Sequence, residues 1–194
     1  MKRNDLILKL YSLPQTVFSL RELGLMFTEI KYVNLKRRLN NLVKTNKLES
    51  PARGIFAKSN FVVYELACKL YSPTYISLES VLVKEGIIFQ KYESVFAISY
   101  INREIKLSNE IIINYKRLKG EILNNKLGVD RKQAYFVASP ERAFTDAVYI
   151  YRDYYFDNLA GLDWDKVFEI SKIYKSKILV KRLESYYKLV KNNV

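Results

Sequence analysis

The segment Ile30–Phe56, IKYVNLKRRLNNLVKTNKLESPARGIF, decides our interpretation of the chain. Its first part predicts an amphipathic helix over residues 31–44, because the apolar residues recur at helical spacing and share one face. The residues expected on that core-facing side are Tyr32, Leu35, Leu39, Leu42 and Val43. The opposite side is basic and polar, so we expect the helix to present it away from the core.

The outward side of this predicted helix carries an unbalanced positive charge. From Lys31 to Lys47 the sequence holds six basic residues and no acidic one, so ion pairs between helical turns cannot neutralise it. A partner with negative charge is the simplest remedy. Arginine suits the edge of guanine and asparagine that of adenine, which favours duplex DNA. The expected base-reading residues are Asn34, Arg37, Asn40 and Asn41, and the expected phosphate contacts are Lys31, Lys36, Arg38, Lys44 and Arg53. A basic helix that simply faces water is the alternative.

The flanking sequence predicts two helices before this one and a hairpin after it. The first helix would end before Pro14, and Ser19 with Glu22 forms a capping box that starts the second. Asn46 suits the left-handed position that ends the third helix, and a five-residue loop containing Gly54 separates strands expected at 47–49 and 55–57. Three helices followed by a hairpin is the order of a winged helix-turn-helix, which we predict for residues 1–59.

Residues 60–194 predict a second domain of mixed helices and strands, so the expected fold class of the chain is α+β. The boundary falls near residues 58–62. The expected helices span residues 61–71, 77–83, 141–149, 163–174 and 178–190, and the expected strands span 95–100, 104–107, 110–115 and 133–138.

Composition restricts the compartment and the class of partner. The net charge is +13, and residues 1–60 contribute +8 of it, from 12 basic and 4 acidic residues. The single cysteine, Cys68, lies in an apolar helical run, which favours a packed thiol and gives no sign of an oxidising compartment. Neither a signal peptide nor a membrane-spanning stretch is evident, so we expect a cytoplasmic protein without a membrane partner.

Few residues in the chain suit catalysis or metal binding. Histidine is absent, no Gly-rich phosphate loop occurs, and the aspartates between residues 153 and 165 lack calcium-loop spacing, so we expect no metal, no cofactor and no enzyme. The remaining polar group is Glu141, Arg142 and Asp146. Arg142 and Asp146 are suited to a structural ion pair one turn apart on a helix. An acid site built from Glu141 and Asp146 is the alternative.

Four segments, taken in order after the expected winged helix, resemble the AbiEi family. They are Arg53–Ala57 (RGIFA), Tyr75–Leu82 (YISLESVL), Gly86–Ile88 (GII) and Ala138–Asp146 (ASPERAFTD). This family is the antitoxin and transcriptional-repressor half of bacterial abortive-infection type IV toxin–antitoxin pairs. The similarity covers nearly the whole chain, and its most specific parts are the second and fourth segments.

The resemblance implies two functions. The N-terminal domain would bind inverted repeats in its own promoter, and the C-terminal domain would counter a nucleotidyltransferase-like toxin, directly or functionally. The chain departs from many relatives in having Asn46 for Gly and Phe56 for Tyr, changes that the fold tolerates. An interaction protein whose winged helix docks a partner without reading DNA is the alternative. The residues with an implied structural or antitoxin role are Tyr75, Ser77, Ser80, Glu141, Arg142 and Asp146.

Overall fold

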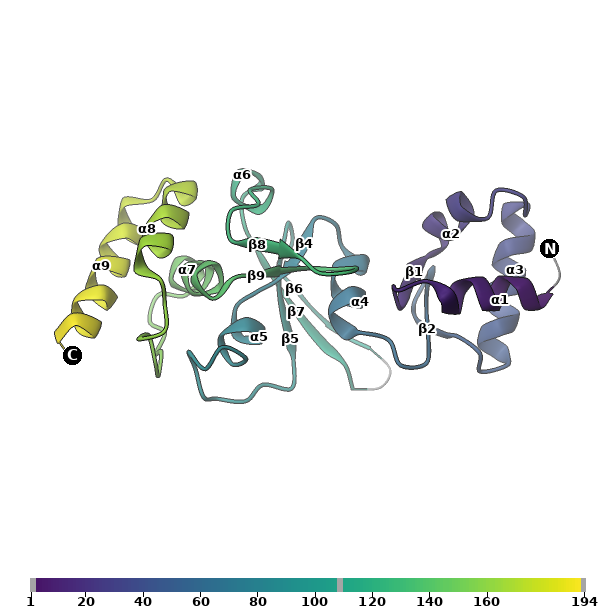
Figure 1. Cartoon of the computed structure of the whole chain (residues 1–194), viewed down its shortest axis with the longest axis horizontal. Coiled ribbons are helices and arrows are strands. Elements are labelled where there is room, and N and C mark those ends of the chain that lie inside the picture. The colour runs from purple at the N-terminus through teal and green to yellow at the C-terminus, as the bar shows by residue number, and fades with distance from the viewer. Residues whose placement is uncertain (1–2, 108–109, 193–194) are drawn as a thin grey trace.

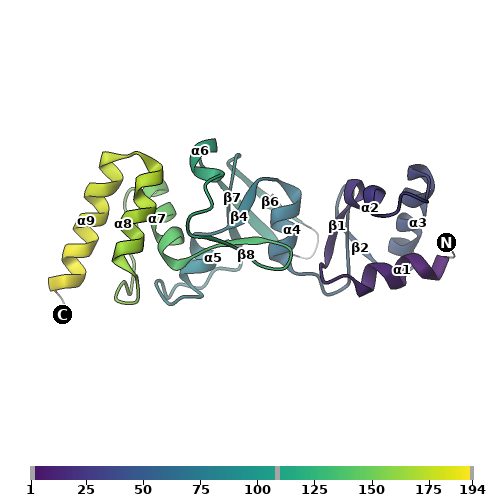
Figure 2. The ribbon, with the colours of Figure 1, turned by 45° about the horizontal axis from the view of Figure 1, so that its top comes forward.

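The computed structural model describes residues 3–107 and 110–192, and its fold class is α+β, as predicted. The molecule is elongated, with the N-terminal elements at one end, a mixed sheet in the middle and two C-terminal helices at the other end (Figures 1 and 2).

Residues 3–57 form three helices and a three-stranded sheet. The helices are α1 (Arg3–Ser12), α2 (Leu20–Met26) and α3 (Tyr32–Lys44), and the strands are β1 (Val17–Ser19), β2 (Glu49–Ala52) and β3 (Ile55–Ala57). The strand order is β1-β3-β2, and both neighbouring pairs are antiparallel. The sequence pattern did not predict β1, because three residues are too few to show a strand period.

The ends of α2 and α3 form as the sequence predicts. The hydroxyl of Ser19 accepts a hydrogen bond from Glu22 N at 3.2 Å, and the Glu22 carboxylate accepts one from Ser19 N at 2.9 Å. Asn46 follows α3 with φ at 52°, in the left-handed region. The hairpin differs from the prediction, because β2 runs on to Ala52, which pairs with Ile55. The expected five-residue loop is a two-residue turn, Arg53 and Gly54, which Gly54 accommodates with φ at 76°.

A six-stranded mixed sheet lies at the centre of the remaining chain. Its order is β6-β7-β5-β4-β9-β8, with parallel pairing between β5 and β7 and between β4 and β9. The strands are β4 (Thr74–Ile76), β5 (Val95–Ser99), β6 (Arg103–Lys106), β7 (Ile112–Arg117), β8 (Val129–Arg131) and β9 (Phe136–Ala138). The helices are α4 (Val63–Leu70), α5 (Glu79–Leu82), α6 (Gly120–Leu123), α7 (Pro140–Ile150), α8 (Trp164–Ser171) and α9 (Lys177–Asn192), with a 3-10 turn, η1 (Lys172–Tyr174).

Helix α7 is the central helix of this second part. The Ser139 hydroxyl caps it by accepting a hydrogen bond from Arg142 N at 3.2 Å, and Pro140 occupies its first turn. Residues 141–148 are all buried, because α7 lies between the sheet on one side and α8 and α9 on the other (Figure 1). The ring of Phe144 packs edge-on against Phe156, Trp164 and Tyr186.

The small sheet separates two hydrophobic cores. On one face Phe18 and Phe56 pack with Leu35, Leu39 and other residues of the three N-terminal helices. On the other face Val17, Ile55 and Ala57 join the core of the second part. Side chains alternate across a strand, so these three-residue strands supply apolar groups to both cores. We call this sheet the shared sheet.

A buried carboxylate strengthens the same junction. Glu65 on α4 accepts hydrogen bonds from Thr16 N at 2.6 Å, Thr16 Oγ1 at 2.8 Å and Val17 N at 3.1 Å. These donors satisfy a charged group that would otherwise be costly to bury. A second contact, between Lys69 Nζ on α4 and Glu22 Oε1 on α2, measures 2.6 Å. No local sequence pattern indicates either contact.

Candidate functional site

Helix α3 presents the basic face that the sequence predicts. Leu35, Leu39 and Leu42 are buried beneath it. The candidate residues Lys31, Lys36, Arg37, Asn40, Asn41 and Lys44 are exposed, whereas Asn34 and Arg38 are half-buried. The helix lies at the outer end of the N-terminal part, away from the six-stranded sheet (Figure 1). The face is therefore accessible to a large partner.

Most of the basic side chains on this face form no ion pair with the described acidic side chains. Arg37 Nη2 donates to Asn34 Oδ1 at 3.2 Å, and this contact carries no formal negative charge. Among the side chains of residues 6–107 and 110–192, no ion pair to an acid is formed by Lys31, Lys36, Arg37, Lys44 or Arg53. A partner with negative charge remains the simplest source of compensation.

The prediction of the core-facing side of α3 was wrong for one residue. Tyr32 was expected beside Leu35, but its side chain is 55% exposed. It stands in the first turn of α3, where its ring lies over Gly24 of α2: a Cβ on that glycine would be 3.3 Å from Tyr32 Cδ2. Val33 beside it is 77% exposed. The outer surface of α3 therefore begins with two apolar side chains.

The hairpin carries Arg53 at its exposed tip. The tip is held against the start of α2, because Leu20 N donates to Gly54 O at 2.8 Å. The Ser50 hydroxyl donates to Ile55 O at 3.1 Å across the hairpin. This bracing fixes the turn that presents Arg53, although the turn is shorter than predicted.

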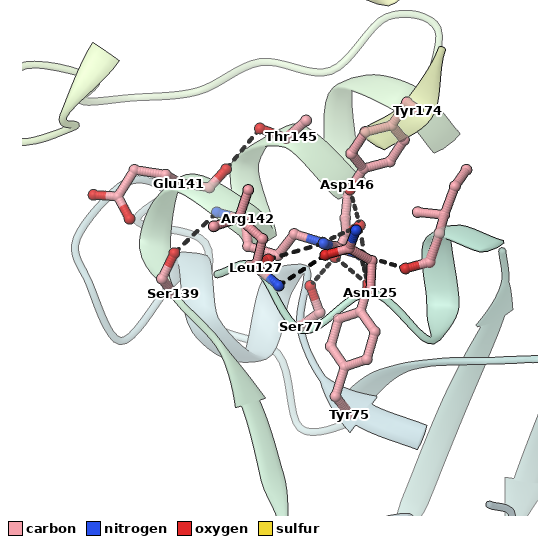
Figure 3. A network of polar contacts seen from close by, with 11 residues as sticks. Tyr75, Ser77, Asn125, Leu127, Ser139, Glu141, Arg142, Thr145, Asp146 and Tyr174 are labelled. Carbon is pink, nitrogen blue, oxygen red and sulfur yellow. Dashed lines mark hydrogen bonds and ion pairs between the residues drawn. The ribbon is translucent and has the colours of Figure 1, made fainter. Parts of the chain in front are cut away.

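A buried polar cluster in the second part contains four of the six residues to which the resemblance assigns a structural or antitoxin role. Arg142 and Asp146 have side chains with 0% exposure, and Arg142 Nε lies 3.4 Å from Asp146 Oδ1. The Tyr75 hydroxyl donates to Asp146 Oδ2 at 3.0 Å and accepts from Arg142 Nη2 at 3.0 Å. Ser77 donates to Asp146 Oδ2 at 2.8 Å, and Tyr174 also donates to this carboxylate (Figure 3).

The remaining donors of Arg142 fix the backbone between α6 and β8. Its Nη2 donates to Ile122 O at 2.9 Å, and its Nη1 donates to Leu127 O at 3.0 Å. Arg142 thus connects α7 to α6, to β4 through Tyr75, and to the loop that leads into β8. A flat guanidinium with several fixed donors is suited to such a junction.

The electrostatics of the cluster follow from burial and pairing. Burial raises the pKa of Asp146, while the Arg142 guanidinium and the hydroxyls of Tyr174, Ser77 and Tyr75 oppose that rise. Burial lowers the pKa of Arg142, but Asp146, Tyr75 and Tyr174 together raise it by more, so the net shift is upward and the guanidinium stays charged. Burial and the charge of Asp146 raise the pKa of both tyrosines. Neither tyrosine is therefore suited to act as a base near neutral pH.

The other two motif residues lie apart from this cluster. Glu141 points away from Arg142 and Asp146 in Figure 3. The pKa of Lys166 is raised mainly by Asp163, and the negative charge of Glu141 adds to this rise. The two carboxylates proposed as an acid pair are not brought together. The Ser80 hydroxyl accepts a hydrogen bond from Phe96 N at 2.7 Å and anchors α5 to the sheet.

The turn before α5 is conformationally strained. Leu78 is fully buried and has φ at 55° and ψ at −140°, a region that residues other than glycine rarely adopt. The strained turn follows directly after Ser77, whose hydroxyl bonds Asp146. The contacts of Ser77 and the burial of Leu78 hold the turn in this conformation.

The described residues offer neither a metal cluster nor a membrane-spanning helix. No group of three or more His, Cys, Asp or Glu side chains is placed to hold a metal ion in the part of the chain that the structure describes. Across residues 3–107 and 110–192, no helix has both the length and the apolar character that crossing a bilayer requires.

Sequence reasoning missed one member of the buried cluster. Tyr174 lies in η1, 28 residues after Asp146, and no local pattern connects the two.

Comparison of the chain with protein-family models and with curated proteins finds no match.

Proposed function

We propose that the chain is a DNA-binding repressor and antitoxin, with a winged helix-turn-helix in residues 1–59 that binds its own promoter. The element order α1, β1, α2, α3, β2, β3 supports this proposal, as does the antiparallel sheet beside the helices. The observation that carries it is the exposed face of α3, whose lysines and Arg37 form no ion pair with an acid among the described residues.

We infer that the polar residues of α3 and the hairpin have different roles in binding DNA. Asn34 accepts a hydrogen bond from Arg37, which aligns the guanidinium before any base is met. We infer that Arg37 reads a guanine while Asn34 orients it, and that Asn40 and Asn41 contact other base edges. The lysines on this face and Arg53 at the hairpin tip would contact phosphates and fix the register.

The second part of the chain would supply the antitoxin function. Tyr75, Ser77, Arg142 and Asp146 are buried, so we infer that they stabilise this part and do not touch a toxin. Contact with a nucleotidyltransferase-like toxin would fall to surface residues supported by this cluster. Neutralisation is tested by co-expressing the chain with the toxin of the adjacent reading frame and measuring growth.

A docking module that does not read DNA is the second candidate. The exposed side chains of Tyr32 and Val33 favour it, because apolar groups are more typical of protein interfaces than of phosphate contacts. The two candidates differ in salt dependence. Binding to duplex DNA weakens steeply with salt, whereas docking through these two side chains does not.

Fluorescence anisotropy with a labelled promoter duplex and a scrambled duplex tests DNA binding. If about six phosphates are neutralised, a plot of log affinity against log salt has a slope of roughly −5. Arg37→Ala is expected to cost about 1–3 kcal/mol and to relax base preference, whereas Lys44→Ala weakens both duplexes alike. Lys188→Ala on α9 is the matched control. Binding that survives the Arg37→Ala, Lys44→Ala double variant unchanged refutes the proposal.

A further inference from the structure

A cavity lies where the N-terminal part meets the second part. Its volume is about 560 Å³, within the range of about 300–1,000 Å³ that holds small organic ligands. One wall is the start of α2, and the others come from the end of α4, the start of β4, the loop after α6 and the β8–β9 hairpin. That hairpin projects toward the N-terminal part in both ribbon views (Figures 1 and 2).

The charges that line this cavity are mostly positive. Arg21, Lys69 and Lys126 face a single acid, Glu22. Lys69 already pairs with Glu22 at 2.6 Å. Arg21 and Lys126 form no ion pair among the residues that the structure describes. They belong to different parts of the chain, Arg21 to α2 and Lys126 to the loop after α6.

The rest of the lining includes an apolar surface. Cys68, Leu123 and Phe136 contribute to it, and Phe136 is an aromatic residue left 41% exposed. Burial raises the pKa of Cys68 to about 11, so its thiol is neutral and behaves as a small apolar group. An apolar lining combined with a few polar groups is the usual composition of a small-molecule site.

We propose that this cavity binds a small organic anion, with a phosphate or carboxylate held by Arg21 and Lys126 and an apolar ring against Cys68, Leu123 and Phe136. Such a ligand compensates two cations that form no ion pair within the described part of the chain. It also contacts both parts of the chain, so its binding energy opposes their separation. Segment 58–62, which connects the two parts, is then cleaved more slowly by protease when the ligand is bound.

Isothermal titration calorimetry on the full chain without DNA tests the site independently of the proposed function. The probes are phenyl phosphate, adenosine 5′-monophosphate and benzoate, with inorganic phosphate and adenosine lacking the ring and the charge, respectively. At least one ring-bearing anion is expected to bind ten or more times more tightly than inorganic phosphate and adenosine. Phenyl phosphate compared with benzoate identifies the preferred anion, and the nucleotide compared with phenyl phosphate shows whether a nucleobase is accepted.

Three variants assign the binding to the cavity. Arg21→Gln and Lys126→Gln each remove one charge from an exposed side chain and are expected to weaken binding at least tenfold. Ala134→Phe fills the cavity and is expected to abolish binding. Lys132→Gln, an exposed lysine of the same hairpin outside the cavity, is the control and leaves affinity unchanged. The proposal is overturned if no ring-bearing anion exceeds inorganic phosphate, or if the Arg21→Gln, Lys126→Gln double variant binds as well as the native chain.

Discussion

Replacing Arg142 by methionine tests whether the buried cluster stabilises the second part of the chain. Methionine keeps much of the aliphatic volume of the side chain but removes its charge. The variant loses the contact with Asp146, the bond with Tyr75, and the bonds to two carbonyls at 2.9 and 3.0 Å. Asp146 is then a fully buried carboxylate without its cation.

The magnitude follows from that uncompensated charge. Removing one partner of a buried pair costs about 3–5 kcal/mol. For a chain of this size each kcal/mol lowers Tm by about 2–4 °C, so the expected loss is roughly 6–20 °C. The loss shrinks in acid, because burial without Arg142 raises the pKa of Asp146 further. As the pH falls, Asp146 of the variant is protonated first in the folded state. Below the pKa of the unfolded state both states are protonated, and the cost of burying the unpaired charge disappears.

Urea unfolding followed by circular dichroism measures this cost, with a double-mutant cycle as the control. Arg142→Met combined with Asp146→Leu removes both charges, and its cost is expected to be at least 1 kcal/mol less than the sum of the two single variants. A cost below about 1 kcal/mol for Arg142→Met, or strict additivity in the cycle, would contradict the reasoning.

Three further predictions concern single positions. Gly128→Ala is expected to cost about 2 kcal/mol or more in urea unfolding, because φ is 70° and the new Cβ lies 2.9 Å from Arg142 Cβ; Gly161→Ala, with no atom within 4 Å, is the neutral control. The net shift of the Glu22 pKa is downward. Burial raises this pKa, but the hydrogen bonds that the carboxylate accepts from Lys69 on α4 and from the Ser19 amide lower it by more. Its stabilisation is therefore present above the ordinary value of 4.5 and lost as pH falls through the lowered pKa, so the stability difference from Glu22→Gln vanishes in acid. Cys68, with its pKa raised to about 11, is expected to react with iodoacetamide on the order of 100-fold more slowly at neutral pH than a free thiol; equal rates would contradict its burial.

The sequence predicts what depends on local patterns. The buried leucines of α3, the capping box at Ser19 and the start of α7 at Pro140 are all set by residues within one or two helical turns. The pairing of Arg142 with Asp146 falls in the same class, since the two side chains are four residues apart on one helix.

What the sequence does not predict depends on distance along the chain. Tyr75 and Ser77 lie 71 and 69 residues before Asp146, so their meeting depends on the pairing of β4 within the sheet. β4 and β8 were not predicted either, because three residues are too few to show an alternation by themselves. β3 is equally short, but the turn residues before it indicated a hairpin. The exposure of Tyr32 has a different cause. The helical wheel assigns a direction to each residue, but Tyr32 is the first residue of α3, where its ring lies over Gly24 of α2 and stays 55% exposed.

The shared sheet limits how the chain can be divided. A fragment ending at residue 59 would retain Val17, Ile55 and Ala57 but lose the core that covers them, leaving an apolar strip prone to aggregation. Joining the N-terminal part to a different C-terminal domain therefore requires a domain whose surface packs against the same three side chains. In this protein, modular exchange is governed by the fit of one small surface and not by the length of a linker.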